Sequence, residues 1–224
     1  APNKSSVPII RHAIAHAPLS AGKRIHFHGF GQSHYQSREM GEALRTLEKA
    51  MLIKLIYPTT QTMMPAETDH KKSPRLQFLD IGLVNHVAGL QQYYFNITDL
   101  NTIYNGKMIE SMVGQELLTV HARIQQPLKF WVREKSQASA EVDYVIPYKK
   151  YLIPIEVKSA TTGRLKSLMQ FMETANHTIA IRLYADKIQR DTLKTPSGKE
   201  FQLLNFPYYL ASQIETYLDG RIFK

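Results

Sequence analysis

The feature that most constrains this chain is a short segment, residues 138–159, with the sequence ASAEVDYVIPYKKYLIPIEVKS. Two runs of alternating apolar and polar residues flank a turn at 147–150. A period of two is typical of β-strands, so the segment predicts an antiparallel hairpin. In each run the apolar and the charged side chains take opposite faces. The apolar set is Val142, Tyr144 and Ile146, then Ile153, Ile155 and Val157; the charged set is Glu141 and Asp143, then Glu156 and Lys158.

The turn sets the register of this hairpin. If it centres on Lys149–Lys150, the numbers of paired residues sum to 299. Asp143 then lies directly across from Glu156, and Glu141 lies across from Lys158. Two carboxylates that face each other across a ladder are destabilising unless their charge is compensated. A divalent cation with oxygen ligands, helped by an adjacent lysine, would compensate it. The arrangement therefore predicts a functional site.

Asp143, followed by Glu156-x-Lys158 on the next strand, resembles the core motif of the PD-(D/E)XK nucleases. A wider stretch resembles the C-terminal region, a domain of unknown function, of a group of prokaryotic AAA+ ATPases. It runs from about Phe27 to Phe171, and its segments are PRLQFLDIGLVN (74–85), GKMIESMVGQEL (106–117), AEVD (140–143) and PIEVKS (154–159). One departure is that AEVD lacks the Pro-Asp of the superfamily's name.

The resemblance implies roles for the charged residues. Asp143 and Glu156 would hold one or two Mg²⁺ (or Mn²⁺) ions, and Lys158 would stabilise charge during hydrolysis of a phosphodiester. Family members commonly add a glutamate from the first core helix, and Glu110 matches that position. By helical angle Glu110 and Glu116 both border the apolar stripe of this helix, so Glu116 stays as the alternative ligand.

Two hypotheses of function follow. The first is an enzyme: a Mg²⁺-dependent deoxyribonuclease-like domain that follows a winged helix and is driven or regulated by an N-terminal AAA+ motor of the same chain. The second is a catalytically inactive module that docks DNA or protein for that motor, because fold alone does not establish activity. A Glu-x-Lys on a strand can also be a solvated ion pair worth under about 1 kcal/mol. This fragment has no G-x-x-x-x-G-K-[ST], so no P-loop ATP site is expected in it.

Composition narrows the class of protein. Hydrophobic residues make up 43% and charged residues 21%, as in globular proteins. No apolar run approaches the roughly 18 residues that span a bilayer, so no membrane partner is expected. The absence of cysteine excludes disulfides and thiolate metal sites and fits a reducing bacterial cytoplasm. A start without Met or a signal peptide predicts an excised fragment.

The net charge of +9 is spread along the chain, with +5 in residues 1–92 and +4 in residues 93–224. Phosphate contacts dominate non-specific affinity for nucleic acids, so this balance favours DNA as a partner. The alternative is a basic protein that its charge keeps in solution.

Residues 1–92 predict a winged-helix-like domain. The expected order is a helix over 9–17, a helix from an N-cap at Ser37 with Glu39 in its first turn, a strand over 52–58, a polar loop over 59–74, a strand over 75–79 and a helix capped by Asp80. The second helix carries an apolar stripe of Met40, Ala43, Leu44, Leu47 and Met51. As a wing, the loop would offer Lys71 and Lys72 to DNA, with Arg38 as a further candidate contact.

Four histidines precede this module. His12 and His16 are four residues apart on the first helix, and His26 and His28 are two apart on an expected strand. They could form a zinc site, but the sequence does not place the pairs together and lacks the H-E-x-x-H pattern. We expect ordinary surface histidines.

Residues 93–224 predict the nuclease-like domain, an α/β (mixed α+β) fold with a mixed central sheet flanked by helices. The expected elements are helix 103–125, strands 128–134, 139–147 and 151–158, helix 164–176, strands 178–184 and 201–205, and helix 207–219. Their first six form the α-β-β-β-α-β order of the nuclease core. Gln170 on the helix after the Glu-x-Lys strand is either a substrate contact or an exposed glutamine.

Overall fold

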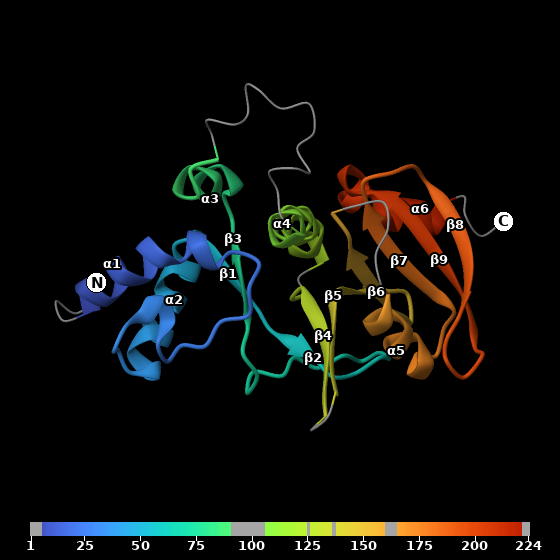
Figure 1. Cartoon of the computed structure of the whole chain (residues 1–224), viewed down its shortest axis with the longest axis horizontal. Helices are drawn as coiled ribbons and strands as arrows, with labels where there is room; N and C mark the ends of the chain where they lie inside the picture. Colours follow the sequence, from blue (N-terminus) through green and yellow to red (C-terminus); the bar gives the residue numbers. More distant parts are fainter. Residues whose placement is uncertain (1–5, 91–105, 125, 136–137, 160–164, 221–224) are drawn as a thin grey trace. The chain divides into compact units, whose positions relative to one another are not determined.

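The computed structural model describes residues 6–90, 106–124, 126–135, 138–159 and 165–220. The chain forms two compact units (Figure 1). The first comprises Ala1–Ile56 and His70–Gln115, and the second comprises Tyr57–Asp69 and Glu116–Lys224. This division by contacts differs from the predicted boundary at 92–93 in two ways: residues 57–69 belong to the second unit, and residues 106–115 belong to the first. No helix in the described part of the chain combines the length and apolar character that crossing a bilayer requires.

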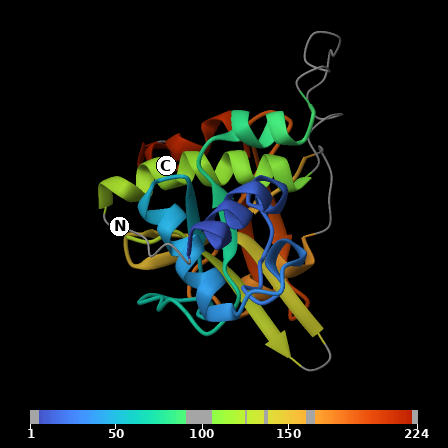
Figure 2. The ribbon, with the colours of Figure 1, turned by 90° about the vertical axis from the view of Figure 1, so that its left-hand side faces the viewer.

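The first unit consists of helices and a two-stranded ribbon. Its elements are α1 (Val7–His16), η2 (Pro18–Ser20), η3 (Phe30–Gln32), α2 (Ser37–Lys49), β1 (Ile53–Ile56), β3 (Arg75–Phe78), α3 (Ile81–Val87) and the first part of α4 (Gly106–Ile124). Helices α1 and α2 pack side by side (Figures 1 and 2). Strands β1 and β3 pair antiparallel, with Ile53 opposite Phe78.

The apolar stripe predicted for α2 forms the core of this unit, with one exception. Buried as predicted are Met40, Ala43, Leu44 and Leu47. Met51 is instead 73% exposed, because α2 ends at Lys49 and Met51 takes a left-handed φ of 58°. The cap also differs: Gln36, not Ser37, is the N-cap, and its backbone N–H donates to Glu39 Oε2 at 3.0 Å.

Two further local predictions can be compared with the structure. Asp80 caps α3 as predicted, because its carboxylate accepts a hydrogen bond from the Leu83 N–H at 3.1 Å. The prediction of a strand around His26 and His28 is wrong, since this stretch forms only an isolated bridge between Arg24 and Arg75. A single bridge satisfies too few backbone groups to make a strand.

The expected strand 52–58 divides between two sheets. Its first part is β1, whereas Pro58–Thr59 form β2, which pairs parallel with β4 (Lys129–Lys135) of the second unit. Most of the loop predicted as a wing therefore belongs to the second unit, and His70–Lys72 remain as the turn before β3. Local sequence could not reveal this division because β2 and β4 are far apart in the chain.

The second unit is a seven-stranded mixed sheet in the order β2-β4-β5-β6-β7-β9-β8. After β4 its elements are β5 (Ala138–Tyr148), β6 (Tyr151–Val157), α5 (Lys166–Thr174), β7 (Ile179–Tyr184), β8 (Gln189–Lys194), β9 (Glu200–Pro207), η6 (Tyr208–Gln213) and α6 (Ile214–Gly220). The predicted α-β-β-β-α-β order from α4 to β7 is confirmed. The prediction missed β8, a polar edge strand, and the expected last helix begins as the 3₁₀ turn η6.

Helices lie on both faces of this sheet. On one face α5 packs Leu168 and Phe171 against a core that includes Val145 of β5. The next residue, Ile146, points to the other face. There it lies with Leu117 of α4 and Ile214 of α6 around a small cavity. The sheet is thus the middle layer of three.

Candidate functional site

The predicted hairpin forms with the predicted register. Strands β5 and β6 pair antiparallel from Tyr148↔Tyr151 to Tyr144↔Ile155, and every pair sums to 299. The turn is at Lys149–Lys150, where Lys149 has a φ of 53°. The ladder ends one position before Asp143 and Glu156, so these two residues stand at its open end.

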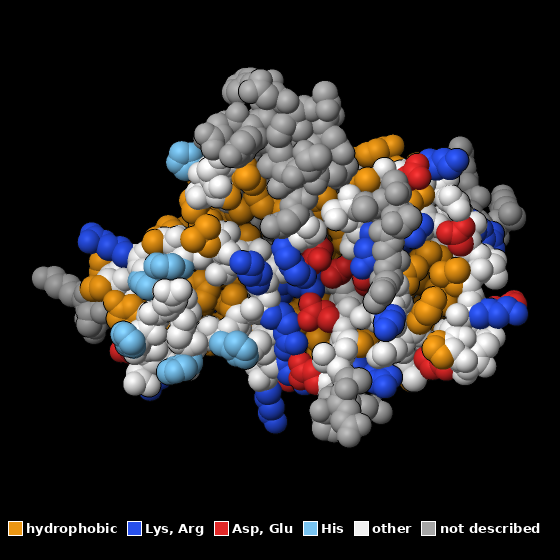
Figure 3. Space-filling view, in the orientation of Figure 1, with side chains coloured by type: hydrophobic (Ala, Val, Ile, Leu, Met, Phe, Trp, Pro, Cys, Tyr) orange, Lys and Arg blue, Asp and Glu red, His pale blue; other side chains and the backbone are white. Residues whose placement is uncertain are grey.

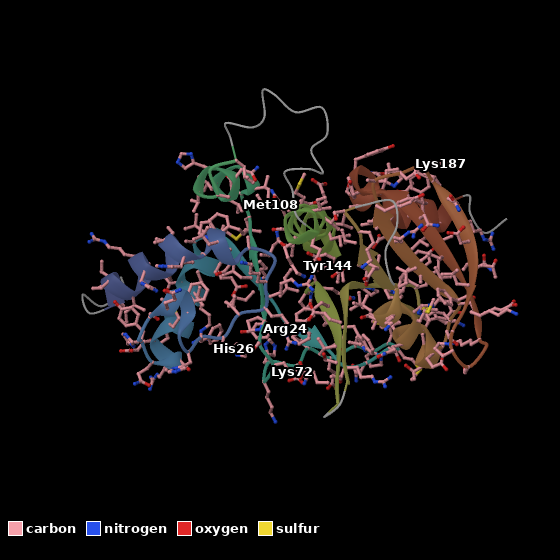
Figure 4. All side chains as sticks on the ribbon, in the orientation of Figure 1. Arg24, His26, Lys72, Met108, Tyr144 and Lys187 are labelled. Atoms are coloured by element: carbon pink, nitrogen blue, oxygen red, sulfur yellow. The ribbon has the colours of Figure 1, made fainter. Side chains whose placement is uncertain are left out.

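A β-bulge in β5 lies at this end. Lys129 of β4 pairs with Val145, but Trp131 pairs with Val142, so two steps along β4 correspond to three along β5. Val142 and Val145 consequently both pack in the core cluster under α5. The prediction that Val142 shares a face with Tyr144 is therefore wrong, because the extra residue reverses the alternation between them. A bulge redirects side chains, and Asp143 lies within it. The residue after it, Tyr144, is labelled in Figure 4.

Asp143 closes the open end of the hairpin. The residue is 7% exposed, and its Oδ2 accepts a hydrogen bond from the Val157 backbone N–H at 2.8 Å. The carboxylate thereby takes the place of a backbone acceptor where the β5–β6 ladder has stopped. This bond fixes Asp143 beside the segment Glu156–Lys158.

Glu156 and Lys158 form an ion pair at the carboxyl end of β6. The Lys158 Nζ donates to Glu156 Oε1 at 2.6 Å, and the exposed fractions of the two side chains are 24% and 8%. The Lys158 backbone N–H donates to the Leu183 carbonyl of β7 at 2.8 Å. Being two residues apart on a strand, Glu156 and Lys158 share a face. Asp143, Glu156 and Lys158 are therefore held at one end of the sheet.

The two candidates for the helix glutamate belong to different units. Glu110 belongs to the first unit, where its Oε2 lies 2.6 Å from Lys107 Nζ and 3.9 Å from the buried Arg75 guanidinium. Glu116 belongs to the second unit and is exposed. Across the described ranges, no cluster of three or more His, Asp or Glu side chains could hold a metal ion.

A polar row crosses the sheet beside the ion pair, and sequence reasoning missed it. Glu156 on β6 is paired with Arg182 on β7, which is paired with Asn205 on β9. The Arg182 guanidinium carbon lies 4.5 Å from the centroid of the Tyr184 ring. Burial raises the pKa of Tyr184. A signal was available, since Arg182 is the only charged residue in IAIRLY and Asn205 interrupts the apolar run LLNFP.

Asn205 is held in place by the edge strand. It is fully buried, and its Nδ2 donates to Asp191 Oδ2 at 2.9 Å and to the Gln189 carbonyl at 3.2 Å. Gln189 is also its partner in the β8–β9 register. The polar row is thus continuous from β6 to the edge of the sheet. Gln170 of α5, the other substrate contact considered, is half-buried.

The predicted DNA contacts of the first unit lie on its surface. Arg38 is exposed and pairs with Glu42 at 3.2 Å along α2. Lys71 and Lys72 lie in the turn before β3 (Figure 4). Nearby, Ser73 accepts from the Arg24 Nε–H at 3.3 Å through its carbonyl. This turn is consequently basic. Figure 3 shows acidic and basic side chains interspersed over the visible face of the second unit.

The histidines have structural partners where these are described. The rings of His12 and His16 stack with centroids 4.1 Å apart. His12 Nε2 donates to the Phe30 carbonyl at 3.1 Å, and His16 Nδ1 donates to the His12 carbonyl at 2.9 Å. Gly31 packs against both rings, where a Cβ would come within 2.5 Å of His16. On the first unit the visible histidines form separate patches (Figure 3).

Fold and site together define an α/β protein with a seven-stranded mixed sheet, flanked by helices, and a carboxylate–lysine group at one end of it. Two family profiles match the chain. Residues 105–209 are similar to a domain of unknown function, DUF4143, which is known from contexts associated with AAA ATPases. Residues 2–94 are similar to another domain of unknown function, DUF8612. Neither a curated protein nor a solved structure gives a match.

Proposed function

We propose that the second unit is a PD-(D/E)XK nuclease-like domain that acts on DNA with Mg²⁺ or Mn²⁺. The observation that carries this proposal is the group at the open end of the β5–β6 hairpin: Asp143 bonded to the Val157 N–H, and Glu156 bonded to Lys158. The α-β-β-β-α-β order from α4 to β7 adds support, since it is the order expected of that nuclease core.

The residues present fit a hard divalent cation. Mg²⁺ is usually held by one or two carboxylates, with water and substrate phosphate completing its shell. Asp143 and Glu156 are the two carboxylates that would hold it, and both are nearly buried. The cation would neutralise phosphate charge and favour ionisation of an attacking water. Glu110 and Glu116 stay as the predicted helix ligands.

The chain's own residues would orient the reaction. The Val157 N–H fixes the carboxylate of Asp143, and the Lys158 ammonium fixes that of Glu156. Lys158 is partly exposed, so its charge is available to a phosphodiester at the strand end. There it would stabilise the negative charge that develops on the phosphate, which is worth more in a partly desolvated site than in water.

We propose further that the chain is the C-terminal region of an AAA+ ATPase and that its first unit is winged-helix-like. The similarity of residues 105–209 to a family found with AAA ATPases supports the first point. The α2-β1-β3 order supports the second. In this proposal Arg38, Lys71 and Lys72 add phosphate contacts, consistent with the net charge of +9.

A specific observation favours a second candidate, a catalytically inactive docking module. Asp143 and Glu156 already bond to groups of their own chain. In the part of the chain that the structure describes, no third acidic or histidine side chain joins them in a metal-binding cluster. Such a site could persist as a structural ion pair after catalysis is lost.

The decisive variant is Lys158→Ala. We expect it to reduce Mg²⁺-dependent cleavage of duplex DNA at least about hundredfold, because it removes a charge needed mainly in the transition state. Duplex affinity, measured with Ca²⁺ in place of Mg²⁺, should change little. The melting temperature should fall, because the variant leaves the nearly buried Glu156 without its ion-pair partner, but the protein should stay folded. Lys150→Ala, at the exposed hairpin turn, is the matched control and should behave as wild type.

Two results would contradict the proposal that the second unit is an active nuclease. Wild-type protein that binds duplex DNA but cleaves none with millimolar Mg²⁺ or Mn²⁺ would establish the DNA-docking module. Wild-type protein that binds no DNA even at low salt would favour docking of a protein partner. Binding that weakens steeply with salt is the expected signature of phosphate contacts.

A further inference from the structure

Arg182 is the most exposed residue of the polar row. Its partner Glu156 is 6% exposed and its partner Asn205 is fully buried, whereas Arg182 itself is half-buried. In a parallel pair, aligned residues point to the same face, so Arg182 lies on the face of Glu156 and Lys158. It therefore carries a positive charge to the surface one strand away from the carboxylates.

The Arg182 side chain runs toward the carboxyl end of β7. Its guanidinium carbon lies 4.5 Å from the ring centroid of Tyr184, the last residue of that strand. The neighbouring Lys158 N–H bonds to the carbonyl of Leu183, so both cations reach the same end of adjacent parallel strands. In open α/β sheets this is the end at which ligands bind.

Among the buried atoms of this row, the Arg182 Nε and the Asn205 Oδ1 have no hydrogen-bond partner within the described ranges. The three hydrogen bonds from Asn205 Nδ2 all run to β8 or to its own strand. The amide is thus fixed, while the guanidinium keeps donor capacity.

The alternative is that Arg182 only neutralises Glu156. That carboxylate already accepts from Lys158 at 2.6 Å. With Asp143 and Glu156 against Lys158 and Arg182, the group has no net charge before a divalent cation is added. A cation would make it positive, which suits a phosphodiester. The guanidinium fork also matches two oxygens of one phosphate, which an ammonium cannot do.

We propose that Arg182 contacts a non-bridging phosphate oxygen of DNA next to the phosphate at Asp143 and Glu156, and that Tyr184 supports its guanidinium. This inference rests on the proposed function, because it assigns a binding residue to the same site. Arg182 would act in substrate binding, whereas Lys158 would act on the reacting phosphate.

The test is Arg182→Met, which keeps the length of the apolar stem over Tyr184 but removes the charge. Affinity for a labelled DNA duplex is measured by fluorescence anisotropy, with Ca²⁺ in place of Mg²⁺, from about 50 to 200 mM salt. We expect affinity to fall about tenfold or more. The slope of log affinity against log salt should become shallower by about 0.9, the loss of one phosphate contact. Arg182→Lys should restore the slope.

The matched control is Arg190→Met on the exposed edge strand β8, which should leave affinity and slope unchanged. If wild type binds and Arg182→Met binds equally well with the same slope, the inference is overturned while the nuclease-like proposal stands. A lower melting temperature of Arg182→Met with an unchanged slope would also overturn it, since Arg182 would then be a structural counter-charge. Wild-type protein that binds no DNA would overturn the proposed function itself.

Discussion

The two units bury charged residues in different settings. In the first unit Arg75 is fully buried, and Glu110 lies 3.9 Å from it and 2.6 Å from Lys107. In the second, the carboxylates of Asp143 and Glu156 lie at a strand end beside cations that reach the surface. Burial of charge therefore does not by itself mark a site. What distinguishes the second group is its position at the end of the sheet.

The polar group of the first unit is bonded as a structural network. Gln77 on β3 is fully buried, and its Nε2 donates to the Ser111 carbonyl at 2.7 Å and to the Ser111 hydroxyl at 3.1 Å. These bonds join β3 to the first part of α4, where Glu110 also lies. The network holds the first part of α4, which carries Glu110, against β3 within the first unit.

The largest expected effect tests this structural role. Arg75→Met should lower the free energy of unfolding by about 3 kcal/mol, because it leaves the mostly buried Glu110 without a buried counter-charge. Urea unfolding with an unchanged m-value would measure it. The matched control is the exposed Arg45→Met on α2, which should change stability by less than about 0.5 kcal/mol. An Arg75 variant as stable as wild type would remove the contrast between the units.

Smaller changes in the free energy of unfolding, which differ between the two variants, are expected for Glu110→Gln and Glu156→Gln. Glu110→Gln should lower it by about 1 to 2 kcal/mol, since Glu110 lies close to two cations. The second should be near neutral or slightly stabilising without metal, because losing the Lys158 pair is offset by relief of repulsion from Asp143.

Mg²⁺ should distinguish wild type from Glu156→Gln and test whether Glu110 is a ligand. Millimolar Mg²⁺ should raise the melting temperature of wild type but not that of Glu156→Gln, and a shift retained by Glu110→Gln would remove Glu110 from the predicted ligands. Thermal unfolding with and without Mg²⁺ measures both points. A wild-type melting temperature that Mg²⁺ leaves unshifted, together with a Glu156→Gln variant no more stable than wild type, would indicate a vestigial site.

The smallest effect concerns His177, a buried ionisable group of the second unit that lies outside the site. Its Nε2 donates to the Leu152 carbonyl at 2.7 Å, and its Nδ1 accepts from the Ile179 N–H at 3.2 Å. Burial lowers the pKa of His177 below its usual 6.5. The unfolded chain therefore binds this proton more readily. The contribution of neutral His177 to the free energy of unfolding is fully present above about pH 6.5. It is lost as the pH falls from there through the lower pKa of the folded state.

His177→Gln should therefore lower the free energy of unfolding by about 1 kcal/mol at neutral pH, where the wild-type imidazole is neutral and makes both hydrogen bonds. Between about pH 8 and 5 its stability should fall less steeply than that of wild type. Melting temperatures across this range give the difference in slope, which isolates His177 from the carboxylates. Parallel slopes for the two proteins would show that His177 does not titrate with unfolding.

Several features could be predicted from short stretches of sequence. The alternation around the Lys149–Lys150 turn predicted the 299 register, and the stripe in α2 predicted its buried face. The cap at Asp80 and the α-β-β-β-α-β order were also predicted. These features depend on neighbours two to four residues apart or on a tight turn, where periodicity carries the information.

Other features depend on strands that are distant in the sequence. The bulge beside Asp143 arises from pairing with β4, and β2 is a strand only because β4 accepts it. The polar edge strand β8 has no apolar alternation to predict it.

By itself, the sequence determined the hairpin, its register and the chemical types of the side chains at its end, because local alternation and a two-residue turn leave little freedom. Only the tertiary structure decided which charges stand together. It paired Glu110 with Arg75 and Lys107 in the first unit, and it aligned Arg182 and Asn205 with Glu156 in the second. The physical reason is that lateral neighbours in a parallel sheet come from separate strands whose register is set by packing across the whole core.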